Sequence, residues 1–208
     1  METEDGLTIE TLLKMPIFQQ FMLNKHKTQY QYYQEKGSPP EILMFVELPG
    51  KTFGEKYMEQ ITRCHYNMEP RDDSGHDHRK LGYAIEEKSA RYHANGGDWK
   101  WQHIEMKHPW AYLFLSGLDF HRIRNFIASR ETVESLISMG IVTGQGKKSD
   151  EGVANAQQGY WFSRSDFAKH GKSFLDYFHE IKNEEELIQF ITQQSSTHSP
   201  PPPPITPP

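Results

Sequence analysis

The stretch from Trp110 to Phe120 constrains the fold more than any other part of the sequence. Tyr112 to Leu115 is a short apolar run, Ser116-Gly117 interrupts it, and Asp119 follows. An apolar run of this length, bounded by a turn signal, is typical of a buried strand. In α/β domains, polar sites form where such strands end and deliver a side chain into a loop. We therefore expect an α/β fold with Asp119 at a strand tip.

The segments on either side extend this pattern of alternating strands and helices. The sequence predicts strands at Glu41–Leu48, Ile141–Val142 and Gly159–Ser163. It predicts helices at Phe53–His65, Leu81–His93, Phe120–Ala128, Glu131–Met139 and from Asn183 onward. Because the run at Glu41–Leu48 is almost entirely apolar, both of its faces should be covered, as in a sheet with helices on each side. We expect a single domain with a mixed sheet flanked by helices.

The ends of the chain differ from this central part. Residues 1–37 predict a helical N-terminal extension that Pro16 interrupts, and residues 38–194 form the α/β domain. Residues 195–208 are mostly proline, which predicts a disordered tail with polyproline II character. Such a tail is a ligand for SH3, WW or profilin-type domains, although a simple terminus is an equally simple interpretation.

Charge and cysteine content limit the partners and the compartment. The 208-residue chain has a net charge of −5, so no global basic field recruits nucleic acid, and nucleic acid is not an expected partner. The single cysteine, Cys64, cannot form an internal disulfide. No signal peptide or membrane-spanning run is present, so we expect a cytoplasmic protein without a membrane partner.

The loop after the first expected strand, Leu48 to Thr52, invites comparison with a phosphate-binding loop. In such a loop glycine N–H groups surround a phosphate and a lysine neutralises it. Here Phe45 occupies the place of the required first glycine, so an ordinary turn is the simpler interpretation. A weaker role remains, in which Pro49, Gly50 and Lys51 contact a diphosphate.

Two further segments suggest binding sites. His76 and His78 would share a face if they lie on a strand, and could then hold a metal ion together, although the surrounding polar residues also fit a solvated loop. Ser129 to Val142, with Lys147-Lys148 after it, is similar to the recognition helix and wing of a winged-helix module. Only Arg130 is basic on that helix, which argues against DNA. The alternative to an enzyme is a non-enzymatic interaction module of this kind, binding nucleic acid or protein, with the Pro-rich tail as a second contact.

Taken in order, three segments of the second half resemble the central part of a GT-A-type glycosyltransferase. Tyr112–Asp119 is similar to the strand that ends in the family's Asp-x-Asp motif, and Glu131–Gly144 to its helix and following strand. Gly159–Phe167 is similar to the segment that carries a glycine, aromatic residues and an arginine. The Asp-x-Asp motif is not intact, because Gly117 stands where its first acid would be.

The resemblance implies a nucleotide-sugar donor and a divalent metal, Mn²⁺ or Mg²⁺, that neutralises the leaving diphosphate. It implies that Asp119 holds the metal and that the Pro49–Lys51 loop lies near the nucleotide. Trp161 and Arg164 would contact the sugar or phosphate. The alternative is structural: Asp119 caps a helix, Trp161 belongs to the core and Arg164 pairs with a surface acid. The enzymatic interpretation requires that Asp119 and the loop at Gly50 meet in one cleft.

Overall fold

The structure is a computed structural model that describes residues 9–17, 19, 28–72, 75–93, 97–145 and 159–195. The Pro-rich tail after Ser195 and the Lys147-Lys148 pair lie outside the described residues. Within the described part of the chain, no helix is long and apolar enough to span a membrane.

A mixed sheet forms the centre of the domain. Within the described residues it contains six strands in the order β1-β2-β3-β5-β6-β9. Their bounds are Glu69–Pro70 (β1), His78–Lys80 (β2), Tyr83–Arg91 (β3), Tyr112–Leu118 (β5), Ile123–Ser129 (β6) and His179–Ile181 (β9). The pair β3–β5 is parallel and every other neighbouring pair is antiparallel. The mixed sheet that the sequence predicts is therefore confirmed.

A small second sheet lies beside the first. Its described strands are β4 (Lys100–Ile104), β8 (Tyr160–Ser163) and β7 (Thr143–Gly144), with β8 in the middle. Strand β4 belongs to the connection between the parallel strands β3 and β5, and it pairs with β8 much later in the chain. The two sheets are therefore linked by the chain itself.

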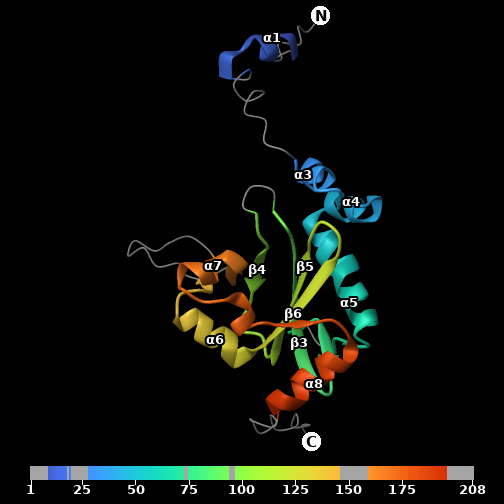
Figure 1. The fold of residues 1–208 in the computed structure, drawn as a ribbon, viewed down its shortest axis with the longest axis vertical. Coiled ribbons are helices and arrows are strands. Elements are labelled where there is room, and N and C mark those ends of the chain that lie inside the picture. The colour runs from blue at the N-terminus through green and yellow to red at the C-terminus, as the bar shows by residue number, and fades with distance from the viewer. Residues whose placement is uncertain are drawn as a thin grey trace, which may run out of the picture.

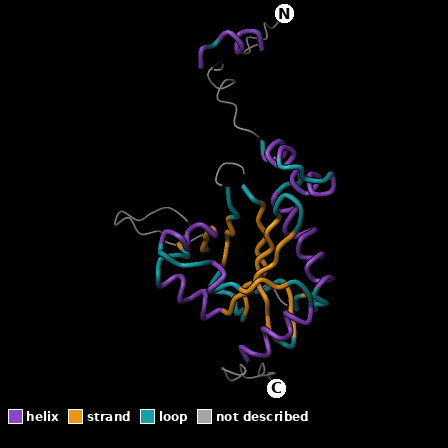
Figure 2. Tube along the Cα trace, in the orientation of Figure 1, coloured by secondary structure: helices purple, strands orange, loops and turns teal. Residues whose placement is uncertain are grey.

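Helices cover both sides of the large sheet (Figures 1 and 2). The helical segments are α1 (Ile9–Lys14), α3 (Gln29–Glu35), α4 (Pro40–Glu47), the π-helical η1 (Thr52–Met58), α5 (Glu59–His65), α6 (Arg130–Ser138), α7 (Arg164–Lys169), the 3₁₀ turn η2 (Phe174–Asp176) and α8 (Glu184–Ser195). In Figure 1, α5 lies on one side of the strands, and α6 and α7 lie on the other.

Alternation along β5 divides the core between the two faces of the sheet, as side chains of a strand point alternately to either side. Leu113 and Leu115 pack with Trp99, Trp101 and other aromatic side chains beneath the small sheet. Tyr112 and Phe114 pack on the opposite face with side chains of α8. A third apolar cluster joins α3, α4 and η1 to the end of β5 at Leu118.

Three predicted elements are wrong. Glu41–Leu48 is the helix α4 and not a strand: Pro40 occupies its first turn, and the buried Leu43 and Val46 are three residues apart, as on one face of a helix. Phe120–Ala128 is not a helix but the strand β6, paired with β5 along its whole length. Leu81–His93 is not a helix, since Tyr83–Arg91 forms β3.

Most of the other predicted helices and strands are confirmed. Helices at Phe53–His65, Glu131–Met139 and after Asn183, and strands at Tyr112 and Gly159–Ser163, are present with bounds shifted by a few residues. The strand expected at Ile141–Val142 is wrong at those two residues: the short strand β7 lies directly after them, at Thr143–Gly144.

Candidate functional site

The strand β3 carries three consecutive charged residues, Glu86, Glu87 and Lys88, in the interior of the domain. Glu86 and Glu87 are each only 4% exposed. Burying a charge is costly unless partners compensate it, so each of these side chains requires an explanation. Because side chains alternate along a strand, Glu86 and Lys88 point to one face of the sheet and Glu87 points to the other.

The neighbours of β3 change along its length. Strand β2 pairs only with residues 83–85 of β3, whereas β5 pairs with residues 85–91. Asp77 stands where β2 leaves β3: its N–H donates to Ile85 O (3.0 Å), and its Oδ2 accepts the N–H of Glu87 (2.8 Å). A carboxylate therefore takes the place of a strand partner beside the charged run.

We call the group formed by Asp77, just before β2, and by Glu86 and Lys88 of β3 the acid–lysine cluster. Glu59 of α5 is not part of it, but its charge acts on Lys88. Lys88 Nζ lies 2.5 Å from Glu86 Oε1, with the two side chains 21% and 6% exposed. Burial opposes the charge of Lys88, but the carboxylates of Glu86, Asp77 and Glu59 together raise the lysine pKa above its ordinary value. Lys88 is therefore held as a cation.

The acid–lysine cluster and Glu59 together contain three carboxyl groups and one ammonium. Burial, then the charges of Asp77, Glu87 and Glu55, raise the pKa of Glu59 to about 8. Burial also raises the pKa of Glu86, although Lys88 opposes this shift. Burial is the first cause of both shifts, so it favours the neutral acid form of these two carboxyl groups.

The acid–lysine cluster fits a Mg²⁺ or Mn²⁺ ion in its donor chemistry. These ions prefer carboxylate oxygens, and Mg²⁺ usually keeps several waters and needs only one or two protein carboxylates. Among the described residues, no group of three or more His, Cys, Asp or Glu side chains converges as a preformed metal site. Asp77 and Glu86 are therefore the two carboxylates that would hold such an ion, with water and substrate completing its coordination.

Glu87 lies between Glu86 and Lys88 on β3, and hydrogen bonds hold its carboxylate on the opposite face of the sheet. Its Oε1 accepts hydrogen bonds from Thr62 Oγ1 (3.0 Å) and Ser116 Oγ (2.7 Å), and its Oε2 lies 2.7 Å from His78 Nε2. Thr62 belongs to α5 and Ser116 to β5, so Glu87 ties the helix to the sheet. Because both carboxylate oxygens of Glu87 are occupied, we assign it a structural role on the face of β3 opposite the acid–lysine cluster.

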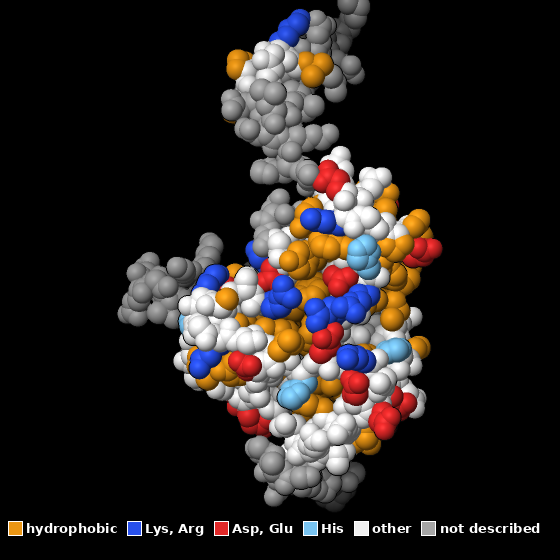
Figure 3. All heavy atoms as spheres, viewed as in Figure 1, with side chains coloured by type: hydrophobic (Ala, Val, Ile, Leu, Met, Phe, Trp, Pro, Cys, Tyr) orange, Lys and Arg blue, Asp and Glu red, His pale blue; other side chains and the backbone are white. Residues whose placement is uncertain are grey.

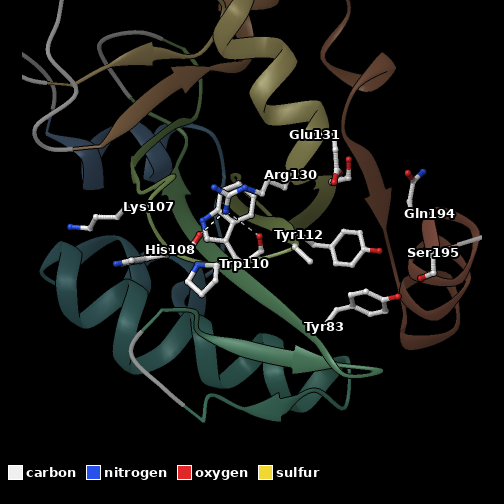
Figure 4. Close-up of a pocket in the computed structure, with 12 residues that line it drawn as sticks. Tyr83, Lys107, His108, Trp110, Tyr112, Arg130, Glu131, Gln194 and Ser195 are labelled. Atoms are coloured by element: carbon white, nitrogen blue, oxygen red, sulfur yellow. Dashed lines mark hydrogen bonds between the residues drawn. The ribbon is translucent and has the colours of Figure 1, made fainter. Parts of the chain in front are cut away.

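Another cavity, of about 580 Å³, opens near the first residues of β5 and α6 (Figure 4). Its cation, Arg130, donates to the carbonyls of Met106, His108 (2.6 Å) and Trp110 (3.3 Å) and to Glu134 Oε1 (3.0 Å). These bonds connect the start of α6 to the β4–β5 connection. Because the guanidinium of Arg130 already donates to these acceptors, the cavity offers a bound anion little free positive charge. We therefore do not take this cavity as the functional site.

Asp119 lies in the tight turn between β5 and β6, not at a helix start as the structural alternative expected. Its Oδ1 accepts the N–H groups of His121 (2.8 Å) and Arg122 (3.0 Å). This is the short-range hydrogen bonding by which aspartate stabilises turns. Asp119 is not among the residues that line the cavity containing Gly50. Its role as a metal ligand stays a prediction, without the shared cleft that it requires.

The loop predicted to contact a nucleotide connects α4 to η1. Pro49 O accepts the N–H of Phe53 (2.8 Å), and Gly50 and Lys51 are already helical. Gly50 lines a cavity, and the 82% exposed side chain of Lys51 lies 3.6 Å from Glu55. The loop therefore follows a helix and not a strand, which removes the basis for comparing it with a strand-to-helix phosphate loop.

Trp161 and Arg164 come from β8 and the start of α7. Arg164 Nε lies 3.5 Å from the buried Asp98, and its guanidinium lies over the ring of Trp99, 5.3 Å from the centroid. Arg164 lines a cavity of about 520 Å³ with Arg124, whereas Trp161 is not among the lining residues. Arg124 is itself paired with Glu180. Basic and acidic side chains also lie next to one another on the face shown in Figure 3.

His76 and His78 differ in their surroundings. His78 is on β2, fully buried, and occupied by Glu87. His76 precedes the strand and lies 3.1 Å from Asp72. With His78 engaged by a carboxylate, a metal ion shared by the two histidines stays a prediction that no contact supports.

The sequence interpretation missed the acid–lysine cluster because it assigned Leu81–His93 to a helix. On a helix, Glu86 and Lys88 would not face the same way. A local signal was present: Gly82 and Asn95-Gly96-Gly97 bound a segment of strand-like length.

Comparisons with known proteins do not assign the chain to a family. No protein-family model matches the sequence. No curated protein matches it either. The function must therefore be argued from the site.

Proposed function

We propose that this protein is a divalent-metal-dependent hydrolase that cleaves phosphodiester bonds of nucleic acid. The observation that carries the proposal is the acid–lysine cluster: Asp77, Glu86 and Lys88 lie where β2 leaves β3, with Lys88 paired to Glu86. Carboxylates for a metal and a fixed cation for a developing negative charge are what this reaction requires.

Each side chain of the cluster has a distinct role in this proposal. Asp77 and Glu86 hold a Mg²⁺ or Mn²⁺ ion, which when bound activates water and neutralises charge on the phosphoryl oxygens. The ammonium of Lys88 stabilises the negative charge that develops on the phosphoryl group. Glu59 of α5, whose pKa is about 8, can hold or release a proton near neutral pH, and its charge acts on Lys88.

The charge of the whole chain does not oppose this substrate. A net charge of −5 describes the entire surface, whereas binding depends on the local field at the site. A divalent ion bound at the cluster would offset the charge of its carboxylates. The expectation that nucleic acid is not a partner rested on the net charge and on the short helix whose only basic residue is Arg130, and neither concerns the acid–lysine cluster.

The test is cleavage of end-labelled double-stranded DNA, single-stranded DNA and RNA, each with Mg²⁺, with Mn²⁺ and with EDTA. We expect metal-dependent cleavage of at least one substrate, and a loss of about 100-fold or more in Asp77→Asn and Lys88→Gln. Lys169→Gln is the matched control, because Lys169 is exposed on α7 and pairs only locally with Asp166. Thermal unfolding of each variant verifies that it is folded.

The proposal is wrong if the folded protein cleaves none of the three substrates with either metal. Cleavage that persists in both Asp77→Asn and Lys88→Gln would also refute it, because the activity would then arise elsewhere. A glycosyltransferase-like activity and a macromolecule-binding module stay predictions from the sequence, and no contact at Asp119, Gly50 or Trp161 favours either of them.

A further inference from the structure

A cavity of about 570 Å³ follows the acid–lysine cluster along β3. We call it the Arg91 cavity. Its polar lining comes from the last residues of β3, from β4 and from the start of α3: Ser89, Arg91, His93, Lys100, Gln102 and Gln29. None of the described residues that line it is Asp or Glu. In a chain with more acidic than basic residues, such a lining is a marked local excess of cations and neutral donors.

Arg91 is the central cation of this cavity. Its guanidinium lies over the Phe53 ring, 4.2 Å from the centroid, and its Nη2 donates to Leu48 O (2.6 Å). Within the described residues, its buried Nε has no hydrogen-bond partner, and no carboxylate pairs with the side chain. Burial lowers the pKa of Arg91 below its ordinary value. A buried donor without a partner costs free energy that a bound anion would recover.

Among the described residues, three other arginines, unlike Arg91, are paired with carboxylates. Arg124 is paired with Glu180, Arg164 with Asp98, and Arg130 with Glu134 and backbone carbonyls. Lys100, at the exposed start of β4, pairs with no carboxylate within the part of the chain that the structure describes. Arg91 and Lys100 thus both line the cavity with their charges uncompensated by an acid.

We propose that the Arg91 cavity binds a phosphate group of the substrate strand other than the one that is cleaved. The assignment of that strand rests on the proposed function, whereas anion binding by the cavity does not. Ser89, Ala90 and Arg91 directly follow Lys88, and three residues of extended strand span about 10 Å. Because side chains alternate along a strand, Arg91 points to the face of the sheet that carries Glu87, whereas Lys88 points to the other face. The Arg91 cavity is therefore a second contact for the strand, separate from the acid–lysine cluster.

The test measures binding without metal, so that it does not depend on cleavage. Fluorescent single-stranded oligonucleotides with a 5′-phosphate or a 5′-hydroxyl are titrated with the full chain in EDTA, and inorganic phosphate is the competitor. The variants are Arg91→Gln and the exposed Lys100→Gln, with Lys169→Gln as the control of equal charge change. We expect binding to weaken on the order of tenfold in Arg91→Gln, and Lys100→Gln to reduce the salt dependence by about one charge.

The oligonucleotide ends distinguish two sources of the phosphate. Tighter binding of the 5′-phosphorylated probe, lost in Arg91→Gln, identifies a terminal phosphate. Equal binding of both probes, weakened in both cavity variants, identifies an internal one. If Arg91→Gln and Lys100→Gln bind every probe as Lys169→Gln does, the inference is wrong. If the cavity binds phosphate but no nucleic acid is cleaved with metal, the proposed function fails and the anion site stands.

Discussion

Two adjacent glutamates of β3 offer the most direct test of the site, because the structure gives them opposite roles. Glu87→Gln replaces the carboxylate that contacts Thr62, Ser116 and His78 on one face of the sheet. Glu86→Gln removes a carboxylate from the cluster on the other face, where it pairs with Lys88. The two substitutions are isosteric and affect neighbouring positions, so each is the control for the other.

The magnitudes follow from the contacts. An amide oxygen at position 87 still accepts from both hydroxyls, but the charged contact with His78 at 2.7 Å is lost. A hydrogen bond to a charged group contributes about 1.5–3 kcal/mol, which for a chain of this length lowers the Tm by about 3–12 °C. Glu86→Gln loses its contact with Lys88 but relieves repulsion with Asp77, so we expect a change within about 1 kcal/mol.

Thermal unfolding at pH 7, followed by circular dichroism, measures both effects. Metal binding, measured by calorimetry with Mn²⁺, should be retained in Glu87→Gln and lost in Glu86→Gln. The reasoning is refuted if Glu86→Gln lowers the Tm as much as Glu87→Gln, or if Glu87→Gln unfolds at the wild-type temperature. Either result would mean that the two faces of β3 have been assigned incorrectly.

Two other predictions concern pH and packing. Folding raises the pKa of Glu59 from 4.5 to about 8. The resulting contribution to the free energy of unfolding is complete below pH 4.5 and is lost as the pH rises through about 8. The metal-free wild-type protein should therefore lose stability between pH 5 and 8.5, and Glu59→Gln should lose less. Mn²⁺ should offset the loss in the wild-type protein. Identical pH profiles of wild type and Glu59→Gln by calorimetry would contradict this. Gly117→Ala should destabilise the fold by about 1–3 kcal/mol in urea unfolding, because a Cβ there would lie 2.8 Å from Trp99 Cε2; an unchanged midpoint would argue against that close approach.

Much of the fold could be predicted because its elements follow hydrophobic patterning. The apolar run at Tyr112 marks β5, which is buried on both faces, and the acidic start of α8 follows Asn183 as a helix start predicts. The apolar run at Glu41–Leu48 led to the prediction of a strand covered on both faces, but the same run also fits a helix. It is a helix beside the sheet, and its Met44 is largely exposed.

The site could not be predicted in the same way. Patterning assumes that buried positions are apolar, and in β3 the buried positions include Glu86 and Glu87. Charged residues are placed in an interior against that rule mainly where function or a compensating network requires them. Asp77, which reveals the role of Glu86, is brought near it by strand pairing, which the sequence alone does not place.

The route of the chain through β4 has a consequence for dissecting this protein into parts. The connection between β3 and β5 pairs with Tyr160–Ser163, so residues of the crossover depend on a segment made some sixty positions later. A fragment ending at Gly144 would leave β4 without its neighbour β8 and expose one side of the aromatic core around Trp101. Because such distant pairings must close before they stabilise anything, the domain should fold slowly and only once its C-terminal third has been synthesised.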